Sequence, residues 1–382
     1  MTTNNLGLYI HIPFCRRKCS YCDFLSFPCS SEQVYGEFVT ALCMEMESRR
    51  ADCEDRVVDT VFIGGGTPSL LSPHDMQRLM DAVYANFNVA EDAEITTESN
   101  PASLDREKLA AYRAGGINRL SIGVQSFDNK TLKLLGRLHD KNQALQAIQM
   151  ARKAGFDNIN IDLMFGIPEQ SLKTWMDTVR QGVFLRPQHI SLYSLQLEEG
   201  TPLYEKVCVK RELEPVPDII DREMYHDAIL FLKDAGYGHY EISNTALEGM
   251  ESRHNMKYWS YEEYLGLGPG ASSFFNGKRF KNHAKMTNYI EDIKKRQVPV
   301  SEGTIADYSE REEMGIYVFT GLRKSEGISL DDFRDRFGMD LFSVYDPAIL
   351  RRHKGLINLY DNQLYLTDAG MDVSNTVMAE FV

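Results

Sequence analysis

The sequence predicts an α/β protein whose main sheet is parallel. Over the first 195 residues, six short runs rich in β-branched and aromatic residues alternate with stretches that carry helix signals. The runs start roughly 25 to 50 residues apart, which leaves room for a helix to cross over between parallel strands. This pattern is typical of a barrel-like or a doubly wound sheet. The expected strands are residues 7–12, 57–63, 94–99, 119–123, 158–163 and 189–195.

Local patterns mark the ends of several helices between these strands. Ser30 and Gln33 resemble a capping box, in which each side chain bonds the backbone of the other residue. Ser72 followed by Pro73 predicts a helix start, because serine caps a helix and proline suits its first turn. Gly155 predicts a helix end, because glycine readily adopts the left-handed conformation found there.

The pattern changes after residue 200 and predicts a smaller second unit. Residues 215–235 read as a helix, and a segment rich in glycine and aromatic residues follows over 236–280. Residues 356–366 read as two short strands around Asp361 and Asn362, which predicts a β-hairpin. The expected divisions are a main domain over 1–240, a connecting segment over 241–300, and a small α+β domain that resembles a winged helix over 301–382.

Composition and charge exclude several classes of function. The 382 residues include 42 Lys and Arg against 55 Asp and Glu, a formal net charge of −13. A protein that binds mainly phosphate backbones would be basic, so we expect no nucleic-acid partner. No run reaches the roughly 18 apolar residues that a bilayer-spanning helix needs. The first residues lack the basic and apolar regions of a signal peptide, which predicts a cytoplasmic protein.

Polar or glycine residues follow the carboxyl ends of five expected strands. A cysteine cluster follows the first strand, a Gly-Gly-Gly-Thr-Pro run at 64–68 follows the second, and Glu98 ends the third. Gln125 follows the fourth strand, and Asp162 lies at the end of the fifth. In parallel α/β sheets these ends meet at one edge, where ligands bind. The sequence therefore predicts one shared site.

The cysteine cluster consists of Cys15, Cys19 and Cys22, and in a reducing compartment such cysteines do not form a disulfide framework. Three thiolates in one short loop can converge on one metal centre. A structural zinc site wants a fourth ligand, which Cys29 or His11 could supply. Three thiolates also suit an iron–sulfur cubane in which one of four irons has no protein ligand. Such an open iron is what a catalyst needs.

This arrangement resembles the radical SAM superfamily. The resemblance rests on Cys-x₃-Cys-x₂-Cys after a first strand, on the aromatic Tyr21 before the third cysteine, and on the Gly-Gly-Gly-Thr-Pro run. It implies a partial (β/α)6 barrel, similar to a TIM barrel, and a [4Fe–4S] cluster bound by the three cysteines. The resemblance also implies that S-adenosylmethionine chelates the open iron, where an electron from the reduced cluster cleaves it to a 5′-deoxyadenosyl radical and methionine.

Within the superfamily, segments from residue 9 to residue 162 resemble the HemN-like group, which contains coproporphyrinogen dehydrogenases and HemW proteins. The resemblance implies that Tyr9, Gly65 and Glu98 contact the cluster-bound S-adenosylmethionine. It also implies contacts to a second S-adenosylmethionine from Tyr21, Gly66, Thr67, Gln125, Arg137 and Asp162. Since HemW-type members need not perform the dehydrogenase reaction, retention of the second molecule stays open.

Three features favour the HemW branch. Phe24 stands where the dehydrogenases carry a further cysteine, and only 14 residues precede Cys15, whereas the dehydrogenases have a longer segment there. A His-Asn-x-x-Tyr-Trp motif begins at His254, and the resemblance associates this motif with heme binding. One imidazole can ligate heme iron while aromatic neighbours cover the macrocycle. Many relatives have histidine where Ser272 stands here, so any role of that histidine does not transfer.

The resemblance implies a heme chaperone that delivers heme to acceptor proteins, with respiratory enzymes as the suggested acceptors and the cluster as a control on oligomeric state or heme release. We expect no porphyrinogen oxidase activity. A homodimer, a peripheral membrane contact and an electron donor such as flavodoxin or ferredoxin are compatible with this implication. The main alternative is an oxygen-independent coproporphyrinogen III dehydrogenase, which decarboxylates propionates to vinyl groups. A radical enzyme acting on tRNA is a third class, and the net charge of −13 counts against it.

Overall fold

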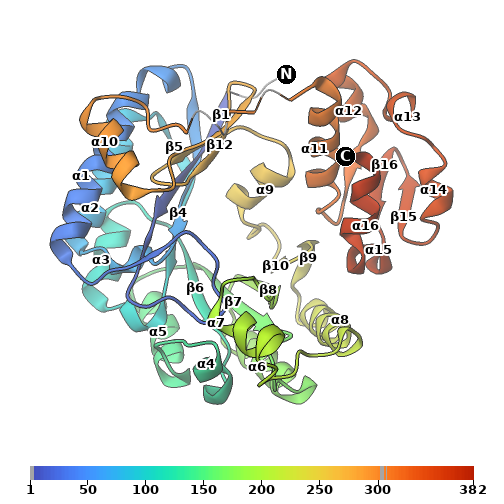
Figure 1. Ribbon diagram of the computed structural model, residues 1–382, viewed down its shortest axis with the longest axis horizontal. Helices are drawn as coiled ribbons and strands as arrows, with labels where there is room; N and C mark the ends of the chain where they lie inside the picture. The colour runs from blue at the N-terminus through green and yellow to red at the C-terminus, as the bar shows by residue number, and fades with distance from the viewer. Residues whose placement is uncertain (1–3, 302–304, 307) are drawn as a thin grey trace.

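All six expected strands form in the computed structural model of the protein, and each pairs in parallel with the next (Figure 1). The structure describes residues 4–301, 305–306 and 308–382. Among these residues, no helix is both long and apolar enough to span a membrane. The six strands are β1 (Asn5–Ile12), β4 (Val57–Gly65), β5 (Val89–Ser99), β6 (Arg119–Gln125), β7 (Asn158–Phe165) and β8 (His189–Ser194).

The main sheet extends beyond these strands at both edges. Strand β11 (Tyr264–Leu267) pairs in parallel with β1, so that Tyr9 lies between Gly266 and Phe62 in the register. Antiparallel strands complete the edges: β9 (Gly238–Glu241), β10 (Asn244–Ala246), β12 (Ser272–Phe275) and β13 (Lys278–Lys281). Within the described residues the sheet has 11 strands, in the order β13-β12-β11-β1-β4-β5-β6-β7-β8-β10-β9. The division of the chain at residues 240 and 300 stays a prediction.

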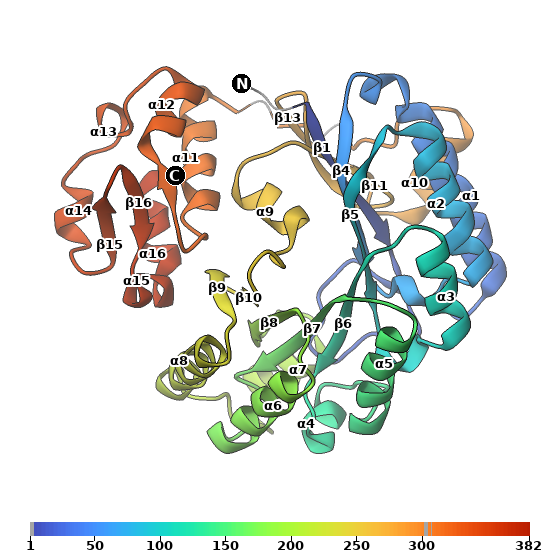
Figure 2. The same cartoon turned by 180° about the vertical axis from the view of Figure 1, so that it is seen from behind.

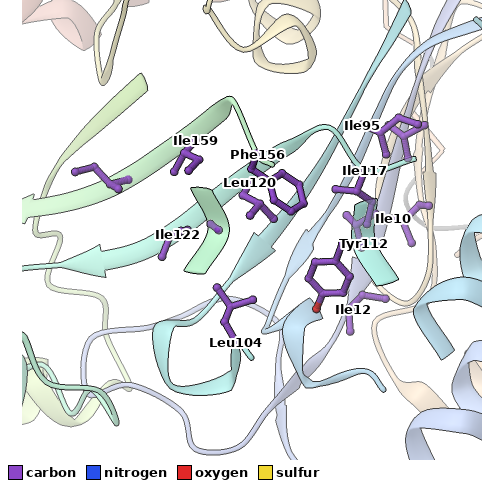
Figure 3. Packing of buried hydrophobic residues seen from close by; sticks show 14 of the residues in the cluster. Ile10, Ile12, Ile95, Leu104, Tyr112, Ile117, Leu120, Ile122, Phe156 and Ile159 are labelled. Carbon is purple, nitrogen blue, oxygen red and sulfur yellow. The ribbon is translucent and has the colours of Figure 1, made fainter. Parts of the chain in front are cut away.

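Helices cover the outer face of the curved sheet. They include α1 (Glu32–Arg49), α2 (Pro73–Asn86), α3 (Arg106–Ala114), α5 (Lys141–Lys153), α6 (Leu172–Phe184), α8 (Asp218–Asp234) and α10 (Met286–Lys294). The strand residues that face them are apolar and fully buried, and Figure 3 shows Tyr112 and Phe156 packed beside strand isoleucines. Burial of this apolar surface is the main stabilising term for the barrel.

The inner side of the sheet carries a different helix. In Figures 1 and 2, α9 (Arg253–Trp259) lies between the sheet and the C-terminal unit, on the side away from the outer helices. Short elements lie in the connections between the strands, among them the parallel pair β2 (Phe14–Cys15) and β3 (Phe27–Pro28), α4 (Asn129–Leu134) and α7 (Pro202–Tyr204).

Two predicted helix ends are confirmed and one is wrong. Ser72 caps α2 by accepting a hydrogen bond from the Asp75 backbone, and Gly155 has a φ of +84° after α5. The cap of α1 is Ser31 rather than Ser30, because Ser31 accepts from the Val34 backbone while Gln33 turns to Glu37 one turn further on. The predicted helix at 215–235 begins at Asp218, directly after Pro217.

The C-terminal unit has its own small sheet and its own apolar core. The predicted hairpin forms, since β15 (Ile357–Tyr360) pairs with β16 (Gln363–Leu366), and β14 (Ile328–Ser329) pairs with β16. Asp361 and Asn362 have φ values of 47° and 64°, as a two-residue type I′ turn requires. The helices are α11 (Glu310–Gly321), α12 (Leu330–Phe337), α13 (Leu341–Val344), α14 (Ile349–Arg352), α15 (Asp368–Asp372) and α16 (Ser374–Met378). The expectation of a small α+β unit is confirmed.

Candidate functional site

Side chains alternate between the two faces of the barrel strands. On β7, Ile159 and Ile161 belong to the outer apolar core, whereas Asn160 and Asp162 line a cavity on the inner face. The same alternation holds on β6 and β8, because successive side chains of a strand point to opposite faces. The open barrel therefore has an apolar outside and a polar interior.

A cavity of about 610 Å³ lies at the carboxyl ends of these strands. Three thiols line it, so we call it the cysteine cavity. Eleven of the thirteen residues predicted for the site line it, namely Cys15, Cys19, Tyr21, Cys22, Gly65, Gly66, Thr67, Glu98, Gln125, Arg137 and Asp162. Of the other two, Tyr9 lines an adjoining cavity and His254 lines neither.

The loop that carries the cysteines is held at its base and at its middle. At the base, β2 pairs with β3, with hydrogen bonds from Phe27 N to Pro13 O and from Cys29 N to Cys15 O. In the middle, Ser20 donates through its backbone to Leu135 O at 3.0 Å and through its hydroxyl to Leu134 O at 2.9 Å. These bonds direct the loop over the strand ends.

All three cysteines of the loop are free thiols and half-buried. Thr67 Oγ1 donates to Cys15 Sγ and Arg137 Nη1 donates to Cys19 Sγ, each at 3.5 Å. Burial raises the pKa of Cys22 to about 11, so metal binding there must displace the proton. Within the described residues, no three His, Cys, Asp or Glu side chains stand at the spacing of ligands around a single ion. Three thiols around an open volume fit a cubane, whose irons are held by separate sulfurs.

The turn after β4 brings its backbone close to the cysteine cavity. Gly65 has a φ of +108°, and a Cβ on it would collide with the ring of His11. A Cβ on Gly66 would stand 2.6 Å from Phe14 O. Only glycine fits at these two positions, so the turn packs directly against the strand that leads into the cysteine loop.

Two buried carboxyl groups, those of Glu98 and Asp162, line the cysteine cavity. Glu98 accepts a hydrogen bond from Gly65 N at 2.9 Å, and burial together with the charge of Asp162 raises the pKa of Glu98 to about 8. Burial also raises the pKa of Asp162, although Asn160 Nδ2 donates to its carboxylate at 2.8 Å. A cation that enters the cysteine cavity would favour the ionised form of both groups, so the pair suits the recognition of a cationic ligand.

Several residues of this interior were not predicted from the sequence. The buried guanidinium of Arg119 lines the cysteine cavity with 1% of its surface exposed, and its Nε has no hydrogen-bond partner in the described part of the chain. Ser121, Asn160, Ser191 and Tyr193 line the same cavity. Every one of them lies two or four residues along a strand from another lining residue, so the two-residue alternation was the available signal.

A second cavity, of about 540 Å³, adjoins the first on the side of β1 and β11. We call it the aromatic cavity, because its walls include the rings of Tyr9, Phe24, Tyr258, Trp259, Tyr261 and Tyr264. Arg279, Lys281 and the exposed Ser272 also line it. Phe24, Gly65 and Glu98 belong to both cavities, so the two share a wall.

His254 lies behind the aromatic cavity, with 0% of its surface exposed. Its Nδ1 bonds Thr60 Oγ1 at 2.8 Å and its Nε2 bonds Tyr258 Oη at 2.8 Å. Burial lowers the pKa of His254 to about 3, so the ring is neutral at physiological pH. Ligation of heme iron by His254 stays a prediction, and the ring nitrogen that binds the iron would have to give up its hydrogen bond to Thr60 or to Tyr258.

Comparisons with known proteins agree with this geometry. A model of the radical SAM superfamily matches residues 9–182, and a model of the HemN C-terminal domain matches residues 308–373. A Bacillus subtilis protein named heme chaperone HemW is 37% identical over 98% of this chain and 98% of its own length. The Escherichia coli protein of the same name is 42% identical over 70% of this chain and 69% of its own length.

The solved structure of HemN from Escherichia coli, a coproporphyrinogen III oxidase described as a radical SAM enzyme, has the same fold. It superposes with a TM-score of 0.86 over 99% of this chain and 90% of that one, at 22% identity. The fold is thus a partial radical SAM barrel followed by a small C-terminal domain. The chain belongs to the radical SAM superfamily, and within it to the HemW family.

Proposed function

We propose that this protein is a heme chaperone, which binds heme and delivers it to acceptor proteins, with respiratory enzymes as the acceptor class. Relatives named heme chaperone HemW match it over nearly their whole length. The observation that carries the proposal is the shared wall between the cysteine cavity and the aromatic cavity. A ligand in one cavity would therefore adjoin a ligand in the other.

In this proposal Cys15, Cys19 and Cys22 hold a [4Fe–4S] cluster, which supplies an electron to S-adenosylmethionine when both are bound. Tyr9, Gly65 and Glu98 bind the cluster-bound S-adenosylmethionine. A second molecule, if retained, binds Tyr21, Gly66, Thr67, Gln125, Arg137 and Asp162. All of these residues except Tyr9 line the cysteine cavity. Tyr9 lines the aromatic cavity, and its hydroxyl bonds His11, whose ring lies beside Gly65 in the wall that the two cavities share.

The chain's own groups prepare this cavity. Thr67 and Arg137 donate hydrogen bonds to the sulfurs of Cys15 and Cys19, which tune any centre that these sulfurs bind. Gly65 N holds the Glu98 carboxyl at the shared wall, where it can accept a hydrogen bond from an ammonium group or release its proton to pair with one. Arg137 also donates to Gly123 O at 2.6 Å, which keeps its guanidinium over the strand end.

The aromatic cavity suits a flat apolar ligand that carries carboxylates. Aromatic rings pack well against the faces and edges of a macrocycle. The guanidinium of Arg279 can pair with a propionate in a bidentate manner. The volume of about 540 Å³ lies within the range of roughly 300–1,000 Å³ usual for small-molecule sites. We therefore assign heme to this cavity.

The proposal further includes a cytoplasmic location and an electron donor such as flavodoxin or ferredoxin. A homodimer and a peripheral contact with a membrane surface are compatible with it.

A transfer experiment tests the proposal. The protein is reconstituted anaerobically, loaded with hemin, and mixed with a heme-free respiratory cytochrome subunit, while EPR follows the cluster with and without S-adenosylmethionine. We expect S-adenosylmethionine to perturb the cluster signal and the acceptor to acquire the heme spectrum. Absence of stoichiometric hemin binding, or retention of all hemin beside a competent acceptor, would overturn the proposal.

The dehydrogenase alternative has its own test. The reconstituted protein is incubated with coproporphyrinogen III, S-adenosylmethionine and a reductant, and porphyrins are separated by chromatography. We expect no vinyl-bearing porphyrin. Its formation over multiple turnovers would establish the oxidase activity and reject a purely chaperone role.

A further inference from the structure

Helix α9 faces both cavities with different side chains. Tyr258 and Trp259 line the aromatic cavity, whereas Asn255 lines the cysteine cavity. His254 lies one helical turn before Tyr258, and its side chain points into the sheet instead. Within the motif, the tyrosine reaches the cavity and the histidine stands behind it.

The motif histidine is held firmly where it is. Its ring stacks on Phe62 with 5.4 Å between centroids, and a Cβ on Gly7 would lie 3.2 Å from His254 Cε1. The start of α9 is fixed because Glu94 accepts hydrogen bonds from the backbones of Arg253 and His254, each at 3.1 Å. Moving the imidazole into the aromatic cavity would break these contacts together.

The last turn of α9 is fixed as well. Lys257 is buried and forms ion pairs with Asp59 and Glu262, each at 2.9 Å. Breaking either ion pair would leave the buried ammonium of Lys257 with an uncompensated charge, which opposes movement of this turn. Contacts at both ends of α9 therefore hold the side chains of this helix in place.

A chain of hydrogen bonds runs from the sheet to the cavity wall through His254. Thr60 Oγ1 bonds His254 Nδ1, and His254 Nε2 bonds Tyr258 Oη, both at 2.8 Å. When Thr60 donates to Nδ1, the neutral ring carries its proton on Nε2 and donates to the tyrosine oxygen. That tautomer stabilises negative charge on Tyr258 Oη without placing a charge on the histidine.

Ferric heme iron is commonly held by histidine, cysteine or tyrosine, and a tyrosinate oxygen suits the ferric state. In the aromatic cavity the neighbours of Tyr258 include the hydroxyls of Tyr9 and Tyr264 and the carboxyl of Glu98. Burial, together with these groups, raises the pKa of Tyr258 well above its usual range, so the phenolate forms only when the iron displaces the proton.

Tyr9 Oη also bonds a buried imidazole, but His11 Nε2 donates to Leu25 O, so the neutral His11 ring accepts from Tyr9 through Nδ1 and offers it no proton. Tyr258 Oη instead bonds His254 Nε2, which can donate to it.

We infer that Tyr258 Oη, and not His254, is the axial ligand of ferric heme bound in the aromatic cavity, and that His254 and Thr60 are positioning residues that hold this oxygen. The inference rests on the proposed function, because it assigns the iron ligand of that heme site. On ligation, the bond between iron and the tyrosine oxygen forms and an iron-bound water leaves. The phenol proton passes to solvent, and the iron stays ferric.

The test titrates hemin into the full-length protein and records resonance Raman and EPR spectra. We expect high-spin ferric heme with phenolate vibrations in the native protein. Tyr258→Phe should lose those vibrations and weaken hemin binding at least about tenfold. His254→Gln should keep the phenolate vibrations at shifted frequency, because the oxygen loses its donor but not its place.

The matched control is Tyr264→Phe, which removes a hydroxyl from the same cavity at a ring 4.6 Å from Tyr258. It should leave the phenolate vibrations intact. Loss of the vibrations in Tyr264→Phe alone would overturn the inference. Low-spin nitrogen ligation that disappears in His254→Gln and persists in Tyr258→Phe would also overturn it, while leaving the chaperone proposal standing. A native protein that binds no hemin would instead reject the chaperone proposal, and the inference with it.

Discussion

The two cavities that share Glu98 are built in different ways. The cysteine cavity is lined by residues at the ends of consecutive parallel strands, so its members recur at regular places along the chain. The aromatic cavity combines β1 with residues 258–281, because β11 returns to pair with the first strand. A site formed by the ends of successive strands can be recognised from sequence. A site that includes a strand from much later in the chain depends on a strand pairing that no local sequence pattern predicts.

The largest expected effect is on cluster content, and it should leave ligand binding in the aromatic cavity unchanged. Cys19→Ala removes one of three thiols, so we expect reconstitution to leave almost no cluster, measured as iron and sulfide per chain. Hemin affinity should stay within about twofold, because Cys19 does not line the aromatic cavity. Cys208→Ser is the control, since this cysteine is exposed and far along the chain, and it should retain full cluster. A Cys19→Ala protein with full iron and sulfide would contradict the assignment.

The next effect belongs to the aromatic cavity alone. Arg279→Gln removes the cation that we pair with a heme propionate, so the dissociation constant of hemin should rise about tenfold while cluster content is unchanged. Arg296→Gln makes the same charge change at an exposed residue and should have little effect. Equal effects of the two substitutions would show that only net charge matters.

The buried histidine behind the aromatic cavity predicts a pH dependence of stability. The pKa of His254 is about 3 in the folded protein and about 6.5 in an unfolded chain, so its contribution to stability is present above pH 6.5 and is lost as pH falls toward 3. Between pH 7.5 and pH 5.5, the free energy of unfolding should fall by about 1.4 kcal/mol more in the native protein than in His254→Gln. Urea unfolding at both pH values measures the difference. Identical pH slopes would mean that His254 is solvated or charged in the folded state.

The smallest effect concerns the anchorage of the cysteine loop. Ser20→Ala removes the hydroxyl that donates to Leu134 O, so we expect a loss of about 1 kcal/mol in the free energy of unfolding. Ser343→Ala is the control, because its hydroxyl also bonds a backbone oxygen but lies exposed in the C-terminal unit. Hemin affinity should not change in either variant. No loss in Ser20→Ala would mean that this bond does not stabilise the loop.

Local patterns predicted much of the barrel and of the cysteine cavity. The strands, the cap at Ser72 and the turn at Asp361 depend on residues close together in the chain, and all are present. Arg119 escaped prediction because a buried arginine looks like a surface residue until its strand neighbours place it on the inner face. Strand β11 was not predicted because Gly266 weakens its strand pattern, and its stability comes from pairing with β1.

The motif at His254 illustrates the limit of a resemblance. The motif residues lie on a helix beside the aromatic cavity, but the sequence of the motif does not determine which of its side chains faces the cavity. That depends on the rotation of α9, which Glu94 and Asp59 set through contacts about 160 and 198 residues away in sequence.

The wall shared through Glu98 has a thermodynamic consequence. With a pKa of about 8, this carboxyl is mostly protonated near neutral pH in the free protein. A cation that enters the cysteine cavity favours the ionised form, and the new negative charge then also faces the aromatic cavity, where propionates carry the same sign. Linkage is reciprocal, so each ligand weakens the other by the same factor. In a protein that carries a ligand in the aromatic cavity, binding of a small cation in the cysteine cavity would therefore promote release of that ligand.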